Sequence, residues 1–440
     1  MASQPTKQET TISTLQHVQR FILIPCLALF LSACVIQDLN QDLNELEANY
    51  GFFKGQVQGA NGESNVVVAL VNKQSDEVES VRTVSHGEPV FALLPRADFY
   101  AVAFEDANGD FIYQPGEAAA RIDDPHISWF GDIEIDDRVD IPSLQVQDIE
   151  LSTENALPDS LDLSVEALAA TTNRTKNFLR VISWDEPNFS AENIRMGMWQ
   201  PQAFLKDVGF GLYVLEEFDP TKNVIVMVHG ISDSPKVFRE LTEAIPDDYQ
   251  LLLFHYPSSS SLEYTSYALS EILDEIVQRY DVAQIDVVAH SMGGLVSKGM
   301  IYQASPDVRE RMRLFVSIAS PFGGHAAASA GTKWAPVVAP VWWAMTPNST
   351  YLQTIDTLDL TQGPKHHLFY TFAHERGGER QEDDTVVSVE SQLAASAQAN
   401  ALAIYPMADS HVGVMSNECT LGMVPAILAD GDKAVTLPGC

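Results

Sequence analysis

Basic residues and cysteines are scarce in this chain. Its 440 residues include 26 Lys or Arg against 60 Asp or Glu, which gives a formal net charge of −34. Such a charge repels phosphate backbones and argues against nucleic acid as a partner, and its spread along the chain is typical of a soluble surface. No group of cysteines and histidines has the spacing of a metal site, which disfavours a zinc enzyme.

The N-terminal segment has the pattern of an export signal. Lys7 and Arg20 precede an apolar run at residues 21–31, which is shorter than the ~20 residues of a membrane-spanning helix and is followed by small residues. The run closes with a stretch that resembles the bacterial lipoprotein box, Leu31-Ser32-Ala33-Cys34. The resemblance implies that residues 1–33 are a signal peptide and that Cys34 carries a lipid.

The residue after this cysteine bears on the expected location. Val35 stands where an inner-membrane retention signal would have Asp, so the resemblance implies a lipid anchor in the bacterial cell envelope, at the outer membrane. An ordinary signal peptide, or a membrane anchor that ends in cysteine, would explain the same residues and stays open.

The other cysteines agree with export. Cys26 falls within the signal, which leaves Cys419 and Cys440. Two cysteines near the end of an exported chain predict one disulfide, with two free thiols as the alternative.

The length of the chain favours two folded domains, and 45% hydrophobic residues allow a sizeable core. Residues 34–49 are polar and are expected to form a lipidated tether, partly helical. Residues 50–150 hold short apolar runs between turn residues, a pattern that predicts a small antiparallel sandwich and is similar to transthyretin-like modules of exported bacterial proteins. Residues 151–195 lack periodicity and are interpreted as a linker.

One loop of the β-rich region could bind calcium. Residues 106–117 run from Asp106 to Glu117 and place oxygen ligands at positions 1, 3, 5 and 12, as calcium loops do. However, Phe111 occupies the position of the sharp-turn glycine, and no helix pair is evident. A hairpin turn rich in Asp and Asn explains the same residues without metal.

Residues 196–440 alternate between strand and helix patterns. Apolar runs at 224–228, 251–254, 285–289 and 314–318 are each typical of strands buried on both faces. Segments with helical spacing separate them, at 262–280 and 292–302. The sequence therefore predicts a mostly parallel sheet with helices on both faces.

The third of these strands leads into the run His290-Ser291-Met292-Gly293-Gly294. A serine between a buried strand and a helix, with small neighbours, resembles the nucleophile elbow of the α/β-hydrolase superfamily. Ala289 replaces the usual glycine, as in the branch of bacterial lipases and esterases that share the Ala-His-Ser-Met-Gly run. The resemblance implies an α/β-hydrolase fold with Ser291 as nucleophile.

A serine nucleophile needs a base and an acid that orients the base, in the chain order serine, acid, histidine. His411 lies beyond a late strand, where this fold places the base, whereas other downstream histidines sit at strand ends: His325, His366, His367 and His374. Asp384, in an Asp-x-Val-Val run similar to the acid loop of these lipases, is the expected acid. Asp383 is its nearest competitor, and weaker alternatives are Asp356, Asp359 and Asp409.

Two backbone donors are expected to hold the oxyanion of the tetrahedral intermediate. One is the N–H of Met292, directly after the nucleophile. The resemblance assigns the other to Ile231, after the His229-Gly230 pair that follows an earlier strand. His229 is expected to brace this loop rather than to react.

These motifs, from about residue 196 to 418, imply a serine hydrolase of carboxylic esters, a lipase or esterase, with no required cofactor. A phospholipase A, thioesterase or acyltransferase would use the same residues, and a peptidase or an inactive surface-binding protein fits less well. Residues 331–361 are expected to form a cap that contains Trp334, Trp342, Trp343 and Met345. These side chains suit either an apolar lid over acyl chains or the core of the cap itself.

Overall fold

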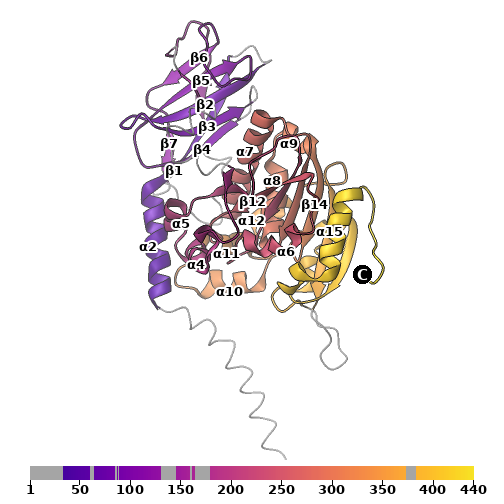
Figure 1. The fold of residues 1–440 in the computed structure, drawn as a ribbon. Coiled ribbons are helices and arrows are strands. Elements are labelled where there is room, and N and C mark those ends of the chain that lie inside the picture. Colours follow the sequence, from indigo (N-terminus) through magenta and orange to yellow (C-terminus); the bar gives the residue numbers. More distant parts are fainter. Residues whose placement is uncertain are drawn as a thin grey trace, which may run out of the picture.

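The computed structural model describes residues 33–59, 64–84, 87, 89–129, 145–158, 161–163, 179–372 and 383–440. A β-sandwich stands at one end of the molecule and a larger α/β unit at the other, and helix α2 (Ala33–Asn49) runs along the side of the α/β unit and ends at the sandwich (Figure 1). Within the described ranges, no helix combines the length and the apolarity needed to cross a membrane. The expected signal peptide lies outside these ranges, apart from Ala33 at the start of α2.

The β-sandwich consists of two four-stranded sheets, of order β4-β1-β7 with β8 paired to β1, and β3-β2-β5-β6. Its strands are β1 (Tyr50–Gln58), β2 (Asn65–Asn72), β3 (Val78–Val84), β4 (Pro89–Pro95), β5 (Phe99–Asp106), β6 (Ala119–Ile122), β7 (Ile127–Trp129) and β8 (Gln147–Glu150). Phe53 and Val68 are fully buried in the core between the sheets. The sheet-rich N-terminal region is thus confirmed, although β8 pairs with β1 in parallel.

The sandwich extends further along the chain than residue 150. Leu157 and Leu163 are buried against the outer face of the β2–β5 pair, beside Phe104. These isolated leucines have no periodic pattern, so the sequence suggested a linker. At the other end of the expected linker, β9 (Arg180–Val181) already pairs with the large sheet, so the α/β unit begins before residue 196.

The loop from Asp106 to Glu117 joins β5 to β6 and is closed by its own carboxylates. The Asp106 carboxylate accepts backbone N–H groups of Gly109 and Phe111 at 2.8 and 3.0 Å. Glu117 accepts the N–H of Gln114 at 2.8 Å. Among the described residues, no group of three or more His, Cys, Asp or Glu side chains is arranged to hold a metal ion. Calcium binding here stays a prediction.

Helix α2 differs from the tether expected at residues 34–49. Leu39 is 1% exposed and packs in the core of the α/β unit. The Asp42 carboxylate accepts the backbone N–H groups of Gln202 and Ala203, at 2.6 and 3.1 Å, at the start of α5 (Pro201–Asp207). A buried leucine and a carboxylate at a helix N-terminus fix α2 on the α/β unit. The segment is therefore a docked helix.

The α/β unit is built on an eight-stranded sheet of order β16-β15-β14-β13-β11-β12-β10-β9. Apart from β9, its strands are β10 (Gly211–Val214), β11 (Asn223–Val228), β12 (Tyr249–His255), β13 (Ile285–His290), β14 (Met312–Ile318), β15 (Lys365–Phe372) and β16 (Ala401–Ala408). Among the described strands, neighbours in this sheet pair in parallel, except β10 with β12, which are antiparallel. The continuous apolar runs of β11 and β13 are buried on both faces, as predicted.

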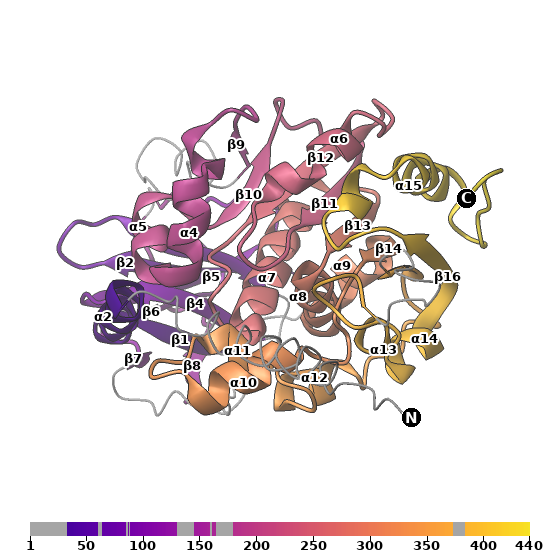
Figure 2. The same cartoon turned by 90° about the horizontal axis from the view of Figure 1, so that it is seen from below.

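Helices cover both faces of this sheet (Figure 2). One core lies under α7 and α8, and a second lies under α6 and α15. Beyond α2 and α5, the α-helices are α4 (Ala191–Trp199), α6 (Arg239–Thr242), α7 (Leu262–Tyr280), α8 (Met292–Gln303), α9 (Pro306–Arg311), α10 (Ala326–Trp334), α11 (Pro340–Met345), α12 (Thr350–Ile355), α13 (Val389–Gln392), α14 (Ala395–Asn400) and α15 (Glu418–Asp430). Short 3-10 helices are η4 (Pro187–Phe189), η5 (Pro235–Phe238) and η6 (Gly413–Ser416).

The sandwich rests on helix α7. The Phe91 and Tyr267 rings pack edge to face, with centroids 4.6 Å apart. Arg82 of β3 lies 3.4 Å from the Glu271 carboxylate, whose side chain is 14% exposed. Burial raises the pKa of Glu271 to about 7, although the positive charge of Arg82 opposes the shift. The joint between the two units thus contains a carboxyl group that ionises near neutral pH.

Cys419 and Cys440 form a disulfide. It ties the first turn of α15 to the end of the described chain and closes a separation of 21 residues.

Candidate active site

Ser291 occupies a sharp turn between β13, which ends at His290, and α8, which begins at Met292. Its backbone angles, φ of 55° and ψ of −129°, are rarely adopted by residues other than glycine. The backbone is held there because the N–H of Ser291 donates to the carbonyl of Ile318 on the next strand, at 2.8 Å. Strained backbone of this kind persists where the surrounding structure enforces it and is frequent at functional sites.

Two glycines let other backbone segments approach this turn. A Cβ on Gly293 would collide with the carbonyl oxygen of Val228, at the end of β11. A Cβ on Gly230 would lie 2.8 Å from Cβ of Ser291 and 3.2 Å from its Oγ. The turn therefore needs small residues at both places, and the Gly230 loop runs directly beside the serine hydroxyl.

Ser291, His411 and Asp384 form a continuous hydrogen-bonded chain. Nε2 of His411 lies 2.8 Å from Oγ of Ser291, and Nδ1 of His411 lies 2.7 Å from Oδ2 of Asp384. An ionised carboxylate only accepts hydrogen bonds, so Nδ1 carries the proton and Nε2 accepts the serine hydroxyl. All three side chains are buried, with exposures of 5%, 6% and 0%. The three expected catalytic side chains, distant in sequence, therefore meet in one site.

Asp384 is held as a carboxylate. Its Oδ1 accepts the backbone N–H groups of Val386 and Val387 at 3.0 and 2.7 Å, and Oδ2 accepts the Thr371 hydroxyl at 2.5 Å. Burial alone would raise the pKa of Asp384, but the hydrogen bond and charge of His411, with the bonds from Thr371 and Val387, lower it. The group is thus ionised at neutral pH and able to fix the ring of His411.

The competing acids have other partners. The Asp383 carboxylate accepts the N–H of Thr385 within its own exposed turn, at 2.9 Å. Asp356 pairs with Lys298 at 2.6 Å. The carboxylates of Asp359 and Asp409 likewise accept hydrogen bonds from neighbouring backbone N–H groups. Within the described part of the chain, none of these four acids is hydrogen-bonded to the His411 ring, whose carboxylate partner is Asp384.

The other downstream histidines are engaged away from Ser291. His366 bonds to the hydroxyl of Ser317 at 2.7 Å, and His367 bonds to the Tyr405 hydroxyl at 2.9 Å. His325 caps α10 and donates to the carbonyl of Val386, at 2.8 Å, which links the cap to the acid loop. His374 lies outside the described residues.

Two buried histidines brace the site. Nδ1 of His229 donates to the carbonyl of Gly230 at 2.8 Å, and its ring stacks on Tyr256 with centroids 4.4 Å apart. Nε2 of His290 donates to the carbonyl of His411 at 2.9 Å. Burial lowers the pKa of His229 to about 4 and that of His290 to about 3, so both rings are neutral. The sequence suggested the bracing role of His229 but not that of His290.

The two expected oxyanion donors border the nucleophile. Met292 is the first residue of α8, so its N–H lies at the open N-terminal end of a helix. Ile231 follows Gly230, whose backbone lies against Ser291. The next residue, Ser232, has a φ of 53°, and its N–H donates to Ser258 at 3.0 Å, which holds the loop in place.

Asp233 is a residue near the site that sequence reasoning missed. It follows the Ile231 loop, and burial raises its pKa to about 6 against the attraction of His411, which lowers it. A carboxyl group close enough to feel the charge of His411 belongs to the electrostatics of the site. The only signal in the sequence was an acidic residue just behind the oxyanion loop.

The cap consists of α10, α11 and α12, and its tryptophans separate into two kinds. Trp342 packs inward against Gly331 and meets Trp199 edge to face, with centroids 6.4 Å apart. Met345 is also buried. By contrast, Trp334 is 84% exposed and Trp343 is 37% exposed. Trp342 and Met345 therefore belong to the core of the cap itself, as one of the two expectations held, whereas Trp334 does not.

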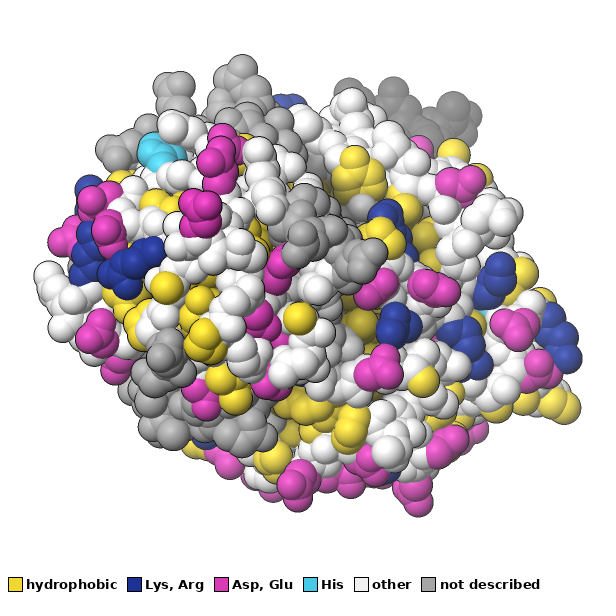
Figure 3. Space-filling view, turned by 90° about the horizontal axis from the view of Figure 1, so that it is seen from above, with side chains coloured by type: hydrophobic (Ala, Val, Ile, Leu, Met, Phe, Trp, Pro, Cys, Tyr) yellow, Lys and Arg dark blue, Asp and Glu magenta, His cyan; other side chains and the backbone are white. Residues whose placement is uncertain are grey.

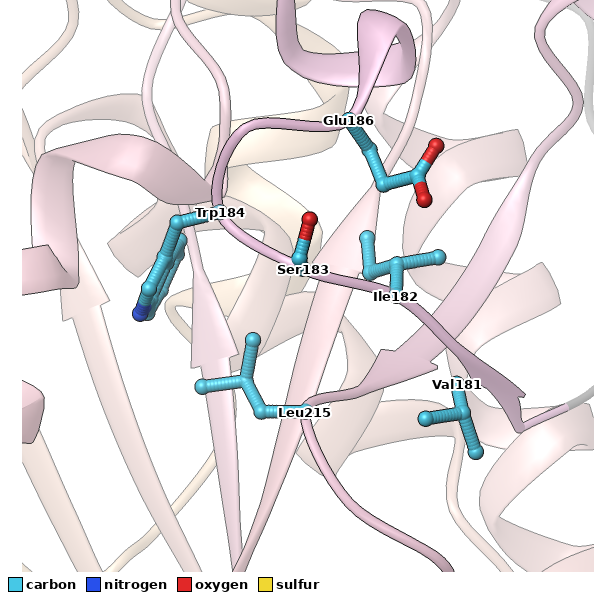
Figure 4. A pocket seen from close by; sticks show the side chains of 6 residues that line it. All are labelled: Val181, Ile182, Ser183, Trp184, Glu186 and Leu215. Carbon is cyan, nitrogen blue, oxygen red and sulfur yellow. The ribbon is translucent and has the colours of Figure 1, made fainter.

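A separate open hollow of about 500 Å³ lies beside the β9 edge of the large sheet (Figure 4). The Trp184 ring stands on one side of it and the Glu186 carboxylate on the other. The hollow is lined by Val181, Ile182, Ser183, Trp184, Glu186 and Leu215. None of these residues belongs to the triad.

Comparison with known proteins agrees with this architecture. The family model described as the alpha/beta hydrolase fold matches residues 223–343, which run from β11 through the elbow into the cap. A curated relative, the uncharacterized hydrolase YugF of Bacillus subtilis, is 27% identical over 115 residues, or 25% of this chain. The match spans 42% of the length of YugF.

Solved structures that are similar to part of this chain include two lipases. Lipase BlEst2 of Bacillus licheniformis in its mature form is 16% identical with a TM-score of 0.37, and the match covers 49% of this chain and 94% of that one. Lipase B of Aspergillus fumigatus is 16% identical with a TM-score of 0.39, over 50% and 56% of the two chains. The sheet order, the elbow and the family match together define an α/β-hydrolase fold in the C-terminal unit.

Proposed function

We propose that this protein is a serine hydrolase of carboxylic esters, of the lipase or esterase kind. The single observation that carries the proposal is the chain of hydrogen bonds from Oγ of Ser291 through His411 to Asp384. A serine hydroxyl is a weak nucleophile near neutral pH, and a histidine within hydrogen-bonding distance, oriented by a carboxylate, makes it reactive.

In the proposed reaction, Nε2 of His411 takes the hydroxyl proton while Oγ of Ser291 bonds to the ester carbonyl carbon. The carbonyl π electrons move to oxygen, and the N–H groups of Ile231 and Met292 stabilise the negative charge. Collapse of this intermediate expels the alcohol, which takes the proton from His411, and leaves an acyl group on Ser291. Water then attacks the acyl group with His411 as base, which releases the acid and restores the serine.

The motifs around Ser291, Asp384 and His411, which resemble those of bacterial lipases and esterases, support an ester as the substrate class. A phospholipase A, a thioesterase and an acyltransferase remain the alternatives, because they would use the same three side chains and differ only in the leaving group or the acceptor.

We further propose that the chain is exported and lipidated at Cys34, and that it is anchored in the outer membrane. The motif around Cys34 and the apolar run before it support this location. Mass spectrometry of the mature N-terminus tests it, since a diacylglyceryl group on Cys34 is expected and an unmodified cysteine would refute it.

Substrate class is tested with the purified full chain. We expect turnover of p-nitrophenyl oxyesters, butyrate and palmitate included, and much slower turnover of the matching p-nitroanilides. Faster cleavage of the anilide would indicate a peptidase. Absence of turnover on every oxyester and thioester would favour a binding protein and overturn the proposal.

A further inference from the structure

Helix α2 connects the N-terminal segment of the chain to the α/β unit. The apolar run at residues 21–31 ends directly before α2, which begins at Ala33. Under the proposed lipidation of Cys34, or with the apolar run itself as the anchor, the attachment point is the N-terminal end of this helix. Because Leu39 and Asp42 fix α2 on the α/β unit, that end has a defined place relative to Ser291.

The triad lies at the same end of the molecule. Ser291, Asp384 and His411 follow the carboxyl ends of β13, β15 and β16, and α10 follows the carboxyl end of β14. In Figure 1 the N-terminal end of α2 and helix α10 both lie at the bottom, away from the sandwich. Figure 2 looks at this end, with α2 seen end-on near α4 and α5 and the cap helices in the lower part of the same view.

This end also carries exposed apolar side chains. Trp334 is 84% exposed, more than any other large hydrophobic side chain of the described residues. Trp343 of the cap is 37% exposed, and Val386 and Val412, next to the acid and the base, are 49% and 60% exposed. We call these four side chains, Trp334, Trp343, Val386 and Val412, the apolar rim. His325 of the cap bonds to the carbonyl of Val386 and so links the cap to the acid loop.

The sandwich end carries charged and apolar side chains. Figure 3, which looks at this end, shows Asp, Glu, Lys and Arg side chains interspersed with apolar ones. Tryptophan prefers the boundary between lipid and water, where its ring is buried and its N–H stays near polar groups. An exposed tryptophan on α10, at the same end of the molecule as the N-terminal end of α2, is therefore suited to enter a bilayer surface.

We propose that the apolar rim docks on a lipid bilayer, with Trp334 inserted among the lipids and the triad end of the large sheet facing the membrane. The docking itself does not depend on the proposed function. The inference that docking brings Ser291 close to its substrate rests on that function. The net charge of −34 opposes attraction to anionic lipids, so the docking is apolar and suits a zwitterionic surface.

The test uses the full chain reconstituted into phosphatidylcholine vesicles, with and without brominated acyl chains that quench tryptophan fluorescence on contact. The brominated lipid is expected to quench the wild-type protein, and Trp334→Phe to lose roughly half of that quenching, with Trp343 accounting for the rest. Trp129→Phe is the matched control, because Trp129 lies on β7 in the sandwich, beyond the C-terminal end of α2.

Equal quenching in the wild type and in Trp334→Phe would overturn the proposal, because a tether alone would hold the protein near the bilayer without inserting this ring. Stronger quenching in vesicles of anionic phosphatidylglycerol would also contradict it, since it would indicate electrostatic attachment. Weaker quenching there is expected.

Enzyme assays separate this proposal from the proposed function. Trp334→Ala should leave turnover of soluble p-nitrophenyl butyrate unchanged and lower turnover of a long-chain ester embedded in the vesicles by roughly tenfold. Tyr302→Ala, which removes a 40% exposed aromatic at the far end of α8, should change neither rate. If the wild type hydrolyses no ester but Trp334 is quenched, the function is wrong and the docking stands. If it hydrolyses esters and Trp334 is not quenched, the docking alone is wrong.

Discussion

Replacement of Asp384 by asparagine tests how the site is organised. The two carboxylate oxygens have separate tasks, because Oδ1 accepts the N–H groups of Val386 and Val387 while Oδ2 accepts His411 and Thr371. An asparagine has one acceptor oxygen and one donor NH₂ group. The NH₂ group of the variant must then point either at the backbone N–H groups of Val386 and Val387 or at the N–H of His411, so one donor faces another.

The backbone donors cannot rotate away, so the NH₂ group of the variant is expected to face Nδ1 of His411. The ring then carries its proton on Nε2, where it cannot accept the hydroxyl of Ser291. Loss of the correct tautomer is worth about 10⁴-fold in kcat, or about 5 kcal/mol of transition-state stabilisation. The misplaced donor should also lower the free energy of unfolding by about 1–3 kcal/mol.

The assay compares kcat on p-nitrophenyl butyrate for Asp384→Asn and Asp383→Asn, with melting curves to verify that both fold. Asp383 is exposed and, among the described residues, its carboxylate accepts the N–H of Thr385, so its variant should retain kcat within about threefold. A large loss in Asp383→Asn with a small loss in Asp384→Asn would refute the assignment of the acid.

Three further predictions concern stability. Burial raises the pKa of Glu271 from 4.5 to about 7, so between these pH values the folded protein binds a proton that the unfolded chain has lost. The free energy of unfolding should therefore fall as pH rises from 4.5 to 7, by at most about 3 kcal/mol. Glu271→Gln should remove this pH dependence from the melting curves. The double variant Cys419→Ser and Cys440→Ser should lose about 3 kcal/mol in urea unfolding, because the disulfide closes a loop of some 20 residues in the unfolded chain, and an unchanged midpoint would contradict this. Leu39→Ala should cost roughly 2–5 kcal/mol and make α2 accessible to protease, whereas continued resistance would show that α2 does not depend on this contact.

Sequence reasoning reached the fold of the α/β unit because its strands are continuous apolar runs separated by helical patterns. It brought Ser291 together with His411 and Asp384 because chain order in this fold restricts which histidine and which acid can meet the serine. Those signals are local, or depend on order alone.

Other features depend on contacts between distant residues and leave no local pattern. Leu39 looks like part of a polar tether until α5 supplies the N–H groups for Asp42 and a core for the leucine. Leu157 and Leu163 look isolated until the outer face of the sandwich covers them. Likewise His290 reads as part of the elbow, and only the folded chain shows that its ring supports the backbone of His411.

The central claim is that Ser291 is the nucleophile, and covalent labelling tests it most directly. The full chain is treated with a fluorophosphonate, and the modified residue is located by peptide mass spectrometry. Labelling of Ser291 is expected, with no label and no ester turnover in Ser291→Ala, whose melting temperature should stay close to that of the wild type. Label on a different serine, or unchanged turnover in Ser291→Ala, would contradict the account.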